Sequence, residues 1–481
     1  MAVSNQYEAV IGLEVHAQLA TASKLFCGDS TAFGAEPNTH ISPITMGHPG
    51  TLPKTNKKAV EYAIRLGLAC NCAIEQENYF ARKNYFYPDL PKGYQISQHT
   101  TPICKGGFIT IKTASGKRNI SLNRIHMEED AGKSIHDLNA DFTCIDLNRA
   151  GTPLVEIVTE PDLFSAEEAW QYVTEVRRLV RWIGICDGNM EEGSLRCDAN
   201  ISIRLKGETR LGTKVEVKNL NSIRNVKKAI EYEIDRMIVL VETGGRVQQQ
   251  TRSFDAATDT TFAIRDKEEA NDYRYFPDPD LAPFHITDEF VHQIKQSLPA
   301  LPNELTAKYQ TTFGLNDYDA SQLCDEKITA AYFESVIPFT THYKALTNWI
   351  LGPLRQYLNE TGLTFESISL TPNILAELIN LVEDGKVSFS AASSRILPLL
   401  FTDNRPPIVI AEQLELLQTS DTTELENWVN QVIEAMPDKI IEYQKGKKGL
   451  IGLFVGEVKK RSKGKADPKL VTQILEQKLN K

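Results

Sequence analysis

Alternating polar and apolar residues run through about the first 290 residues, and this pattern restricts the fold more than any other feature of the chain. Successive side chains of a strand point to opposite faces of a sheet, so the alternation predicts strands with one buried and one polar face. The strongest segments span residues 7–19, 154–160, 196–205 and 213–218. Together they predict an antiparallel sheet.

Two helices are expected among these strands. Ser165 followed by Glu168 has the spacing of a capping box and predicts a helix that begins there. A second helix is expected over residues 223–241 and should end at Gly244 and Gly245. Because helices and strands do not alternate regularly, we expect an α+β fold rather than a doubly wound parallel sheet.

Beyond residue 298, apolar residues recur at helical spacing almost throughout. At 481 residues the chain is too long for a single core. Pro406 and Pro407 predict a joint, because proline ends helices and stiffens the backbone. We therefore expect a domain over residues 1–292 that contains the sheet, a helical domain over 293–405, and a small helical tail domain over 406–481.

Several absences narrow the class of protein. No run approaches the roughly 18 apolar residues that a membrane span needs, and the first residues lack the pattern of a signal peptide. The eight cysteines include no C-x-x-C pair, so we expect a reducing, cytoplasmic environment and no membrane contact. Neither a P-loop nor a G-x-S-x-G motif is present, so we expect no P-loop around ATP and no amide hydrolysis by this chain.

The polar faces of the predicted strands carry residues suited to a binding site. Several carboxylates with one imidazole suit Mg²⁺ or Mn²⁺ better than zinc, and neighbouring Lys and Arg suit polyphosphate. A solvated sheet face would mix charges in the same way, so a site and a plain surface both remain open at this level. The candidates are Glu14, His16, Glu156, Glu160, Arg196, Asp198, Lys214, Glu216 and Lys218.

Three consecutive acids at residues 128–130 would ordinarily form a solvated turn. An upstream strand that contains Ser121, Asn123, Ile125 and Met127 would place Glu129 in its register. Of the three acids, Glu129 is therefore the candidate for the site.

The tail holds a dense basic segment. Between residues 445 and 469, nine Lys or Arg stand against Glu457 and Asp467, a local net charge of +7 in a chain whose total is −10. This density, with glycines that allow close backbone approach, is typical of phosphate-backbone binding, although a solvated charged surface has the same pattern. The candidate contacts to nucleic acid are Lys445, Lys447, Lys448, Lys459, Lys460, Arg461, Lys463 and Lys465.

Seven segments, taken in order, resemble the successive motifs of the GatB family, which contributes one component of the tRNA-dependent amidotransferases known as GatCAB. The segments are "IGLEVHAQL", "RKNYFYPDLPKGYQISQ", "HMEEDAGKS", "DLNRAGTPLVEIVTEPD", "MEEGSLRCDANIS", "VEVKNLNS" and "DYRYFPDPD". The tail segment "GKKGLIGLFVGEVKKRSKGKADPKLV" extends the resemblance over nearly the whole chain.

The resemblance implies an antiparallel-sheet cradle domain related in fold to glutamine synthetase, then a helical domain and a YqeY-like tail. It implies ATP-dependent conversion of Glu-tRNA(Gln) to Gln-tRNA(Gln), or of Asp-tRNA(Asn) to Asn-tRNA(Asn). The side-chain carboxylate of the misacylated tRNA would be phosphorylated and then amidated. The partners it implies are GatC and the amidase GatA, which releases the ammonia.

The resemblance also assigns roles to individual residues. It implies Mg²⁺ ligands at Glu14, His16, Glu129 and Glu156, and it associates Lys83 and Lys92 with the path of ammonia. Strand alternation alone adds further candidates for contact with ATP or the metal, namely Arg196, Asp198 and Lys218.

The chain departs from the family pattern at one place. Many relatives carry a zinc knuckle of the form C-x-C followed by C-P-x-C. The corresponding residues here are Cys27, Asp29, Ser42 and Thr45, and one thiol in such a set does not make a tetrahedral zinc site. We therefore predict that no structural zinc binds, and that local packing braces this loop instead.

Two other functions fit parts of the pattern. A stand-alone ATP-dependent amine ligase for a small acid would need the carboxylates but not the basic tail. A non-catalytic tRNA-binding adaptor would need the tail but not the clustered carboxylates.

Overall fold

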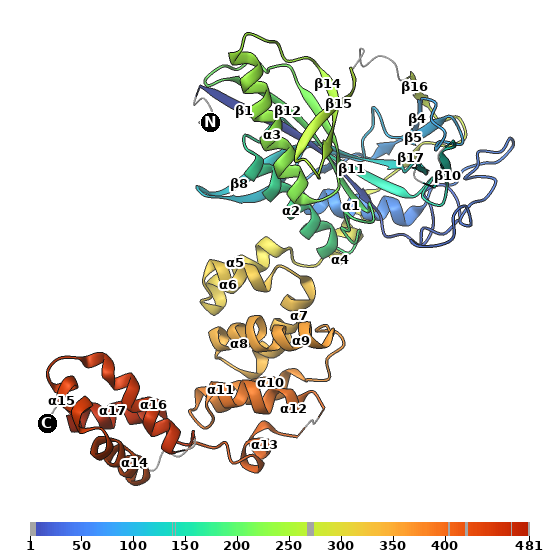
Figure 1. Cartoon of the computed structure of the whole chain (residues 1–481). Helices are drawn as coiled ribbons and strands as arrows, with labels where there is room; N and C mark the ends of the chain where they lie inside the picture. The colour runs from blue at the N-terminus through green and yellow to red at the C-terminus, as the bar shows by residue number, and fades with distance from the viewer. Residues whose placement is uncertain are drawn as a thin grey trace. The chain divides into compact units, whose positions relative to one another are not determined.

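The computed structural model describes residues 6–136, 138–139, 141–266, 274–402, 405–418, 422–462 and 464–479. They fall into two compact units, residues 1–301 and 302–481. All described strands lie in the first unit, and the second contains only helices among its described elements (Figure 1). The predicted domain boundary at residue 292 lies inside α4 (Asp288–Ser297), which packs against α1 (Lys57–Ala69), so the first unit continues to Leu301.

A 13-stranded sheet organises the first unit and confirms a mixed α+β fold with a mostly antiparallel sheet. Its main path runs β15-β14-β13-β12-β1-β11-β8-β5-β4-β16; β6 and β7 also pair with β8, and β2 pairs with β6. Among the described pairs, only β13 and β14 run parallel. Two further two-stranded sheets join β9 to β10 and β3 to β17. The strands are β1 (Tyr7–Gln18), β2 (Ala73–Ile74), β3 (Glu77–Asn78), β4 (Ala81–Asn84), β5 (Tyr94–Ser97), β6 (Cys104–Lys105), β7 (Phe108–Thr113), β8 (Gly116–Glu129), β9 (Lys133–Ile135), β10 (Cys144–Asp146), β11 (Pro153–Thr159), β12 (Leu195–Leu205), β13 (Val215–Leu220), β14 (Gln250–Asp255), β15 (Thr260–Asp266), β16 (Arg274–Pro277) and β17 (Phe284–His285).

Helices α2 (Ala166–Trp182) and α3 (Ile223–Glu242) cover the apolar face of the central strands (Figure 1). Leu13 and Val15 of β1 are completely buried on that face. Burying one such side chain contributes about 1.5–3 kcal/mol, which fixes the face that each strand turns inward. Since side chains alternate, Glu14 and His16 point to the opposite face, as the sequence predicts.

Capping residues set the limits of these two helices. The Ser165 hydroxyl accepts a hydrogen bond from the Glu168 backbone N–H at 3.1 Å, which confirms the predicted start of α2. Ser222 caps α3 in the same way through Asn225. Beyond the end of α3, Gly244 adopts a φ of +83°, a left-handed conformation that favours glycine and ends the helix.

The second unit is helical, and its last part has a hydrophobic cluster of its own. Leu425, Val429, Phe454 and Leu475 are buried in that cluster, to which the described residues contribute only from 425 onward. No described helix of the chain is both long and apolar enough to cross a membrane. The helices are α5 (Pro302–Phe313), α6 (Asp317–Leu323), α7 (Lys327–Val336), η2 (Ile337–Phe339), α8 (Tyr343–Trp349), η3 (Ile350–Leu354), α9 (Arg355–Thr361), α10 (Pro372–Glu383), α11 (Phe389–Ala391), η4 (Ala392–Ile396), α12 (Leu397–Leu400), α13 (Pro407–Gln413), α14 (Thr422–Ala435), α15 (Pro437–Gln444), η5 (Lys448–Leu450), α16 (Ile451–Arg461) and α17 (Pro468–Leu479).

A carboxylate lies at the centre of the loop where relatives carry the zinc knuckle. Asp29 accepts hydrogen bonds from the Cys27 thiol at 3.3 Å, from the Thr45 hydroxyl and from the Ser42 side chain. Burial would raise the pKa of Asp29, but these hydrogen bonds and the nearby Lys24 ammonium lower it. An ionised carboxylate with three surrounding donors thus braces the loop.

Restoring the three missing thiols should restore zinc binding, because the four side chains already converge on one point. The triple variant Asp29→Cys, Ser42→Cys, Thr45→Cys should bind one zinc per chain, and the natural sequence should bind none. Metal content after exhaustive dialysis, measured by mass spectrometry, checks this. Stoichiometric zinc in the natural protein that disappears on Cys27→Ser would contradict the prediction.

Candidate active site

Four neighbouring strands align polar residues in one row across the sheet. His16 on β1 lies opposite Arg196 on β12 and opposite Glu156 on β11. Glu156 in turn lies opposite His126 on β8. Directly opposed residues share a face, with Cβ atoms about 4.5–5.5 Å apart, so the row brings two imidazoles to either side of one carboxylate.

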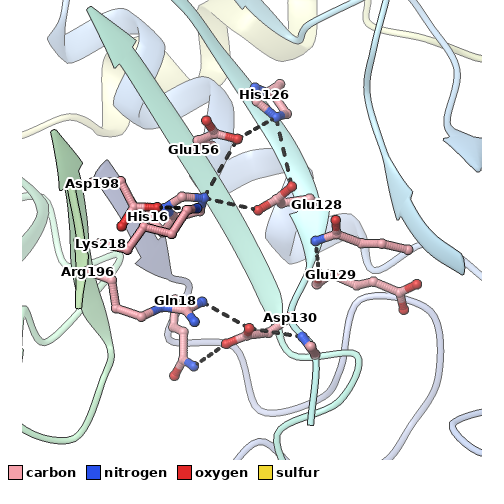
Figure 2. Close-up of polar contacts among 12 residues, drawn as sticks. His16, Gln18, His126, Glu128, Glu129, Asp130, Glu156, Arg196, Asp198 and Lys218 are labelled. Carbon is pink, nitrogen blue, oxygen red and sulfur yellow. Dashed lines mark hydrogen bonds and ion pairs between the residues drawn. The ribbon is translucent and has the colours of Figure 1, made fainter. Parts of the chain in front are cut away.

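Glu128 completes a group of ligand atoms around His16. The His16 Nε2 atom lies 3.5 Å from Glu128 Oε1 and 3.7 Å from Glu156 Oε2 (Figure 2). One ligand atom from each of these three residues falls within 4.8 Å of the others, close enough for all to bind one metal ion. His126 Nε2 lies 3.0 Å from Glu156 Oε2 and 3.9 Å from Glu128 Oε2.

The structure does not place Glu129 in this group, contrary to the sequence prediction. Figure 2 shows its side chain pointing away from His16, Glu128 and Glu156. The Glu129 carboxylate instead accepts hydrogen bonds from Lys92 and from the Ile96 backbone N–H, on the other face of the sheet.

A β-bulge explains the error. Val158 of β11 pairs with Arg124, but the next residue, Thr159, pairs with Leu122, so Asn123 is an extra residue in β8. A one-residue shift exchanges the two faces of a strand. Ser121 and Asn123 therefore do not predict the faces of the residues that follow the bulge.

Two residues of the site, His126 and Glu128, were not predicted from the sequence. The signal was present, because Arg124, His126, Glu128 and Asp130 alternate with Ile125, Met127 and Glu129. All residues from 125 to 130 are buried, so burial alone does not distinguish the two faces.

A second acidic group adjoins the first on the same face. Glu14 lies opposite Asp198, and Lys218 donates to Asp198 at 3.0 Å and lies 3.3 Å from Glu216. Asn200 donates to Glu14 at 2.9 Å. The structure thus brings Glu14, Asp198 and Lys218 together, as predicted from alternation, and adds Glu216 to them.

The carboxylates of the two groups disfavour one another's charge. Burial raises the pKa of Glu14, and the nearby Glu156, Asp198 and Glu216 raise it further. Burial and the Glu156 charge likewise raise the pKa of Glu128. For Glu156, burial is outweighed by His126, His16 and Lys83, which lower its pKa. A bound cation would relieve this repulsion, and the oxygen-rich donor set fits Mg²⁺ or Mn²⁺.

Arg196 is held by a buried carboxylate at the end of β8. Asp130 accepts from Arg196 at 2.9 Å and from Gln18 at 2.7 Å, and Arg149 lies 3.5 Å away (Figure 2). Burial would raise the pKa of Asp130, but the two guanidinium groups lower it. Among the described residues, the buried Arg196 Nε atom has no hydrogen-bond partner.

Both groups line one cavity of about 1240 Å³, which lies entirely within the first unit. Lys83, Arg124, Arg196 and Lys218 supply cationic side chains to its wall. A separate cavity of about 230 Å³ is lined by residues that include Lys92 and Glu129. The two predicted ammonia-path lysines therefore line different cavities, and Asp130 lines both.

The basic residues of the tail fall mostly on η5, α16 and the segments that flank them. Lys459 and Lys460 are exposed at the end of α16. Some cations have acidic partners: Lys447 pairs with Glu442 at 2.9 Å, and Arg461 with Glu457 at 3.6 Å. The predicted contacts Lys445 and Lys448 are exposed and Lys465 is half-buried, whereas Lys463 lies outside the described residues.

Comparison with known proteins identifies the family. Residues 9–292 match the family model described as the GatB/GatE catalytic domain, and residues 331–479 match the model described as the GatB domain. A protein of Geotalea daltonii is 48% identical over 477 residues, covering 98% of this chain and 99% of its own length. Proteins of Caldanaerobacter subterraneus and Geotalea uraniireducens are 47% and 49% identical, each covering 99% of this chain and 100% of its own length. All three are named as the GatB component of an aspartyl/glutamyl-tRNA(Asn/Gln) amidotransferase. The chain therefore belongs to the GatB family.

Proposed function

We propose that the chain is the GatB component of an ATP-dependent tRNA amidotransferase, and that it carries the carboxylate-activating site. The observation that carries this proposal is the group of His16, Glu128 and Glu156 in a large polar cavity of a family catalytic domain. The substrates are Glu-tRNA(Gln), Asp-tRNA(Asn) or both, and the products carry Gln or Asn.

The chemistry requires two steps. A carboxylate is a poor acyl donor, because oxide is not a viable leaving group. In the first step, a side-chain carboxylate oxygen of the misacylated tRNA attacks the γ-phosphorus of ATP, and ADP leaves. In the second step, ammonia attacks the acyl carbon, inorganic phosphate leaves, and the nitrogen loses a proton.

The first step brings a carboxylate close to polyphosphate, so charge must be offset at the point of transfer. His16, Glu128 and Glu156 would hold Mg²⁺, with Glu14 beside them. Bound Mg²⁺ supplies Lewis-acid stabilisation of the phosphoryl oxygens. The buried carboxylates orient the site and exclude water from it.

Arg196, Asp198 and Lys218 would contact ATP or its metal from the neighbouring strands. The Nε atom of Arg196, which has no partner among the described residues, is available to an anionic oxygen. Lys218 bridges Asp198 and Glu216, so it offsets their charge and leaves the wall of the cavity less negative.

Ammonia would come from a partner amidase, GatA, with GatC as the third component of the complex. The smaller cavity with Lys92 and Glu129 is the proposed entry, and Lys83 stands in the larger cavity where the acyl phosphate would form. Asp130 lies at the boundary of the two cavities.

Replacing Lys92 by Met should separate delivery of ammonia from its use. Glutamine-dependent amidation should fall about tenfold or more, because ammonia no longer reaches the acyl group in a directed way. Amidation supported by added ammonium chloride should stay within about twofold, since the phosphorylation site is on the other face of the sheet. Lys105→Met, which removes an exposed lysine paired with Glu75, is the matched control. An equal fall with both nitrogen donors would contradict the path.

We further propose that residues 1–292 form a cradle domain of the glutamine-synthetase type, that residues 293–405 form a helical domain, and that residues 406–481 form a YqeY-like tail. The antiparallel sheet with its concave polar cavity supports the first assignment. The separate hydrophobic cluster from residue 425 supports the last, and its basic segment is proposed to bind the tRNA backbone.

One assay tests the proposed function. The full chain is combined with its partner proteins, ATP, Mg²⁺, glutamine and each misacylated tRNA, and the amino acid attached to the tRNA is then analysed. Formation of Gln-tRNA or Asn-tRNA that requires ATP is the expected result. ATP turnover on a small acid without tRNA would favour a stand-alone ligase. Binding of tRNA without Mg²⁺-dependent binding of ATP would favour an adaptor.

A further inference from the structure

His126 is a second imidazole beside the candidate metal site, and its two ring nitrogens have different neighbours. Its Nε2 atom lies 3.0 Å from Glu156 Oε2. Its Nδ1 atom accepts a hydrogen bond from Arg124 Nε at 3.4 Å. The ring is only 4% exposed, so water does not replace either neighbour.

The contact with Arg124 determines which nitrogen carries the proton. A guanidinium group has five N–H donors and no acceptor, so Nδ1 of His126 must act as the acceptor. A neutral imidazole has one N–H, which is then on Nε2 and points at the Glu156 carboxylate. A ring nitrogen that carries a proton does not bind a metal ion.

The tautomer changes the set of ligands that the site offers. With His126 as a donor, the site has one imidazole, that of His16, and the carboxylates of Glu128 and Glu156. This set suits a hard divalent cation. If Nε2 of His126 were unprotonated, two imidazoles and carboxylates would converge, a set that zinc and iron bind well.

We propose that Arg124 fixes the tautomer of His126, so that His126 is a positioning residue for Glu156 and the site prefers Mg²⁺ or Mn²⁺ to Zn²⁺. Arg124 is then the residue that determines metal selectivity, although it touches no ligand itself. The selectivity part rests on the proposed cation role of the site, whereas the tautomer does not.

The tautomer is tested first, in the metal-free full-length chain labelled with ¹⁵N-histidine. Nitrogen NMR distinguishes a protonated from an unprotonated ring nitrogen, and His126→Gln identifies the signal that belongs to His126. An unprotonated Nδ1 and a protonated Nε2 are expected. A proton on Nδ1 overturns the proposal, whatever the metal affinities are.

Selectivity is tested with Arg124→Met and its matched control Arg124→Lys, which have similar length but differ in the donor. The dissociation constants of Mn²⁺ and Zn²⁺ are measured by electron paramagnetic resonance and by competition with a chelator. In Arg124→Met the preference for Zn²⁺ over Mn²⁺ should rise about tenfold or more, because His126 can shift its proton and become a ligand. Arg124→Lys should keep the ratio of the natural chain. An unchanged ratio in Arg124→Met overturns the proposal.

The positioning role is tested with His126→Gln and His126→Leu. Glutamine donates to Glu156 from an amide, whereas leucine fills the space without a donor. Mn²⁺ affinity should be kept within a few-fold in His126→Gln and fall about 10–100-fold in His126→Leu. Equal losses in both would mean that His126 only fills space. If the natural chain itself binds no Mn²⁺, the proposed cation role fails, and the nitrogen NMR result still decides the tautomer.

Discussion

The variant Glu156→Gln is expected to lose ATP-dependent amidation by about 10³-fold, because a metal supplies several kcal/mol at the transition state and each 1.4 kcal/mol is tenfold in rate. Glu156 lies between His16 and His126 in the polar row, and glutamine keeps its size but not its charge. The measurement is the rate of Gln-tRNA or Asn-tRNA formation by the complex that contains the variant.

Two controls separate this loss from damage to the fold. Affinity for tRNA should not change, and the partner amidase should hydrolyse glutamine at its usual rate. Glu160→Gln makes the same change just beyond the end of β11, at an exposed position that contacts Asn123, and should leave amidation within about twofold. Loss of tRNA affinity in step with activity would contradict the role of Glu156 at the metal.

The second large effect is expected in the tail. Changing Lys459, Lys460 and Arg461 together to Gln removes three cations from one end of α16. Affinity for aminoacyl-tRNA should fall about 10–100-fold at low salt, and the slope of log affinity against log salt should fall by about 2–3, because each lost phosphate contact removes about 0.7–0.9 from that slope. Binding by filter retention over a range of salt concentrations measures both.

A matched pair of lysines in the same tail provides the control. Lys439 is paired with Glu442, and Lys478 with Glu426, outside the basic segment. Changing these two lysines to Gln should leave the slope within about 0.5 of its original value. If the control variant lowers the slope as much as the triple variant does, the tail acts through its overall charge and the basic segment has no special role.

Period-two alternation predicted much of the site. It placed Glu14 with His16, Asp198 with Lys218, and Glu156 on the same polar face, because each of these strands pairs regularly over the residues concerned. It failed on β8, where the extra residue at Asn123 reverses the faces. A bulge depends on how two strands fit together, so the sequence of one strand does not reveal it.

The loop around Asp29 shows another limit of sequence reasoning. The loss of three thiols predicts the absence of zinc, but it does not predict what braces the loop. Three donors around one ionised carboxylate form only when residues 27–29 and 42–45 come together in the fold. Local packing was expected there, and the structure has a polar network instead.

The β-bulge at Asn123 makes the length of β8 as important to the site as its residues. A deletion of one residue there would restore regular pairing and rotate the rest of the strand by half a turn. His126 and Glu128 would then exchange places with Met127 and Glu129 without any of these residues being changed. Insertions and deletions in this strand therefore act as a change of reading phase, which a survey of substitutions alone would not detect.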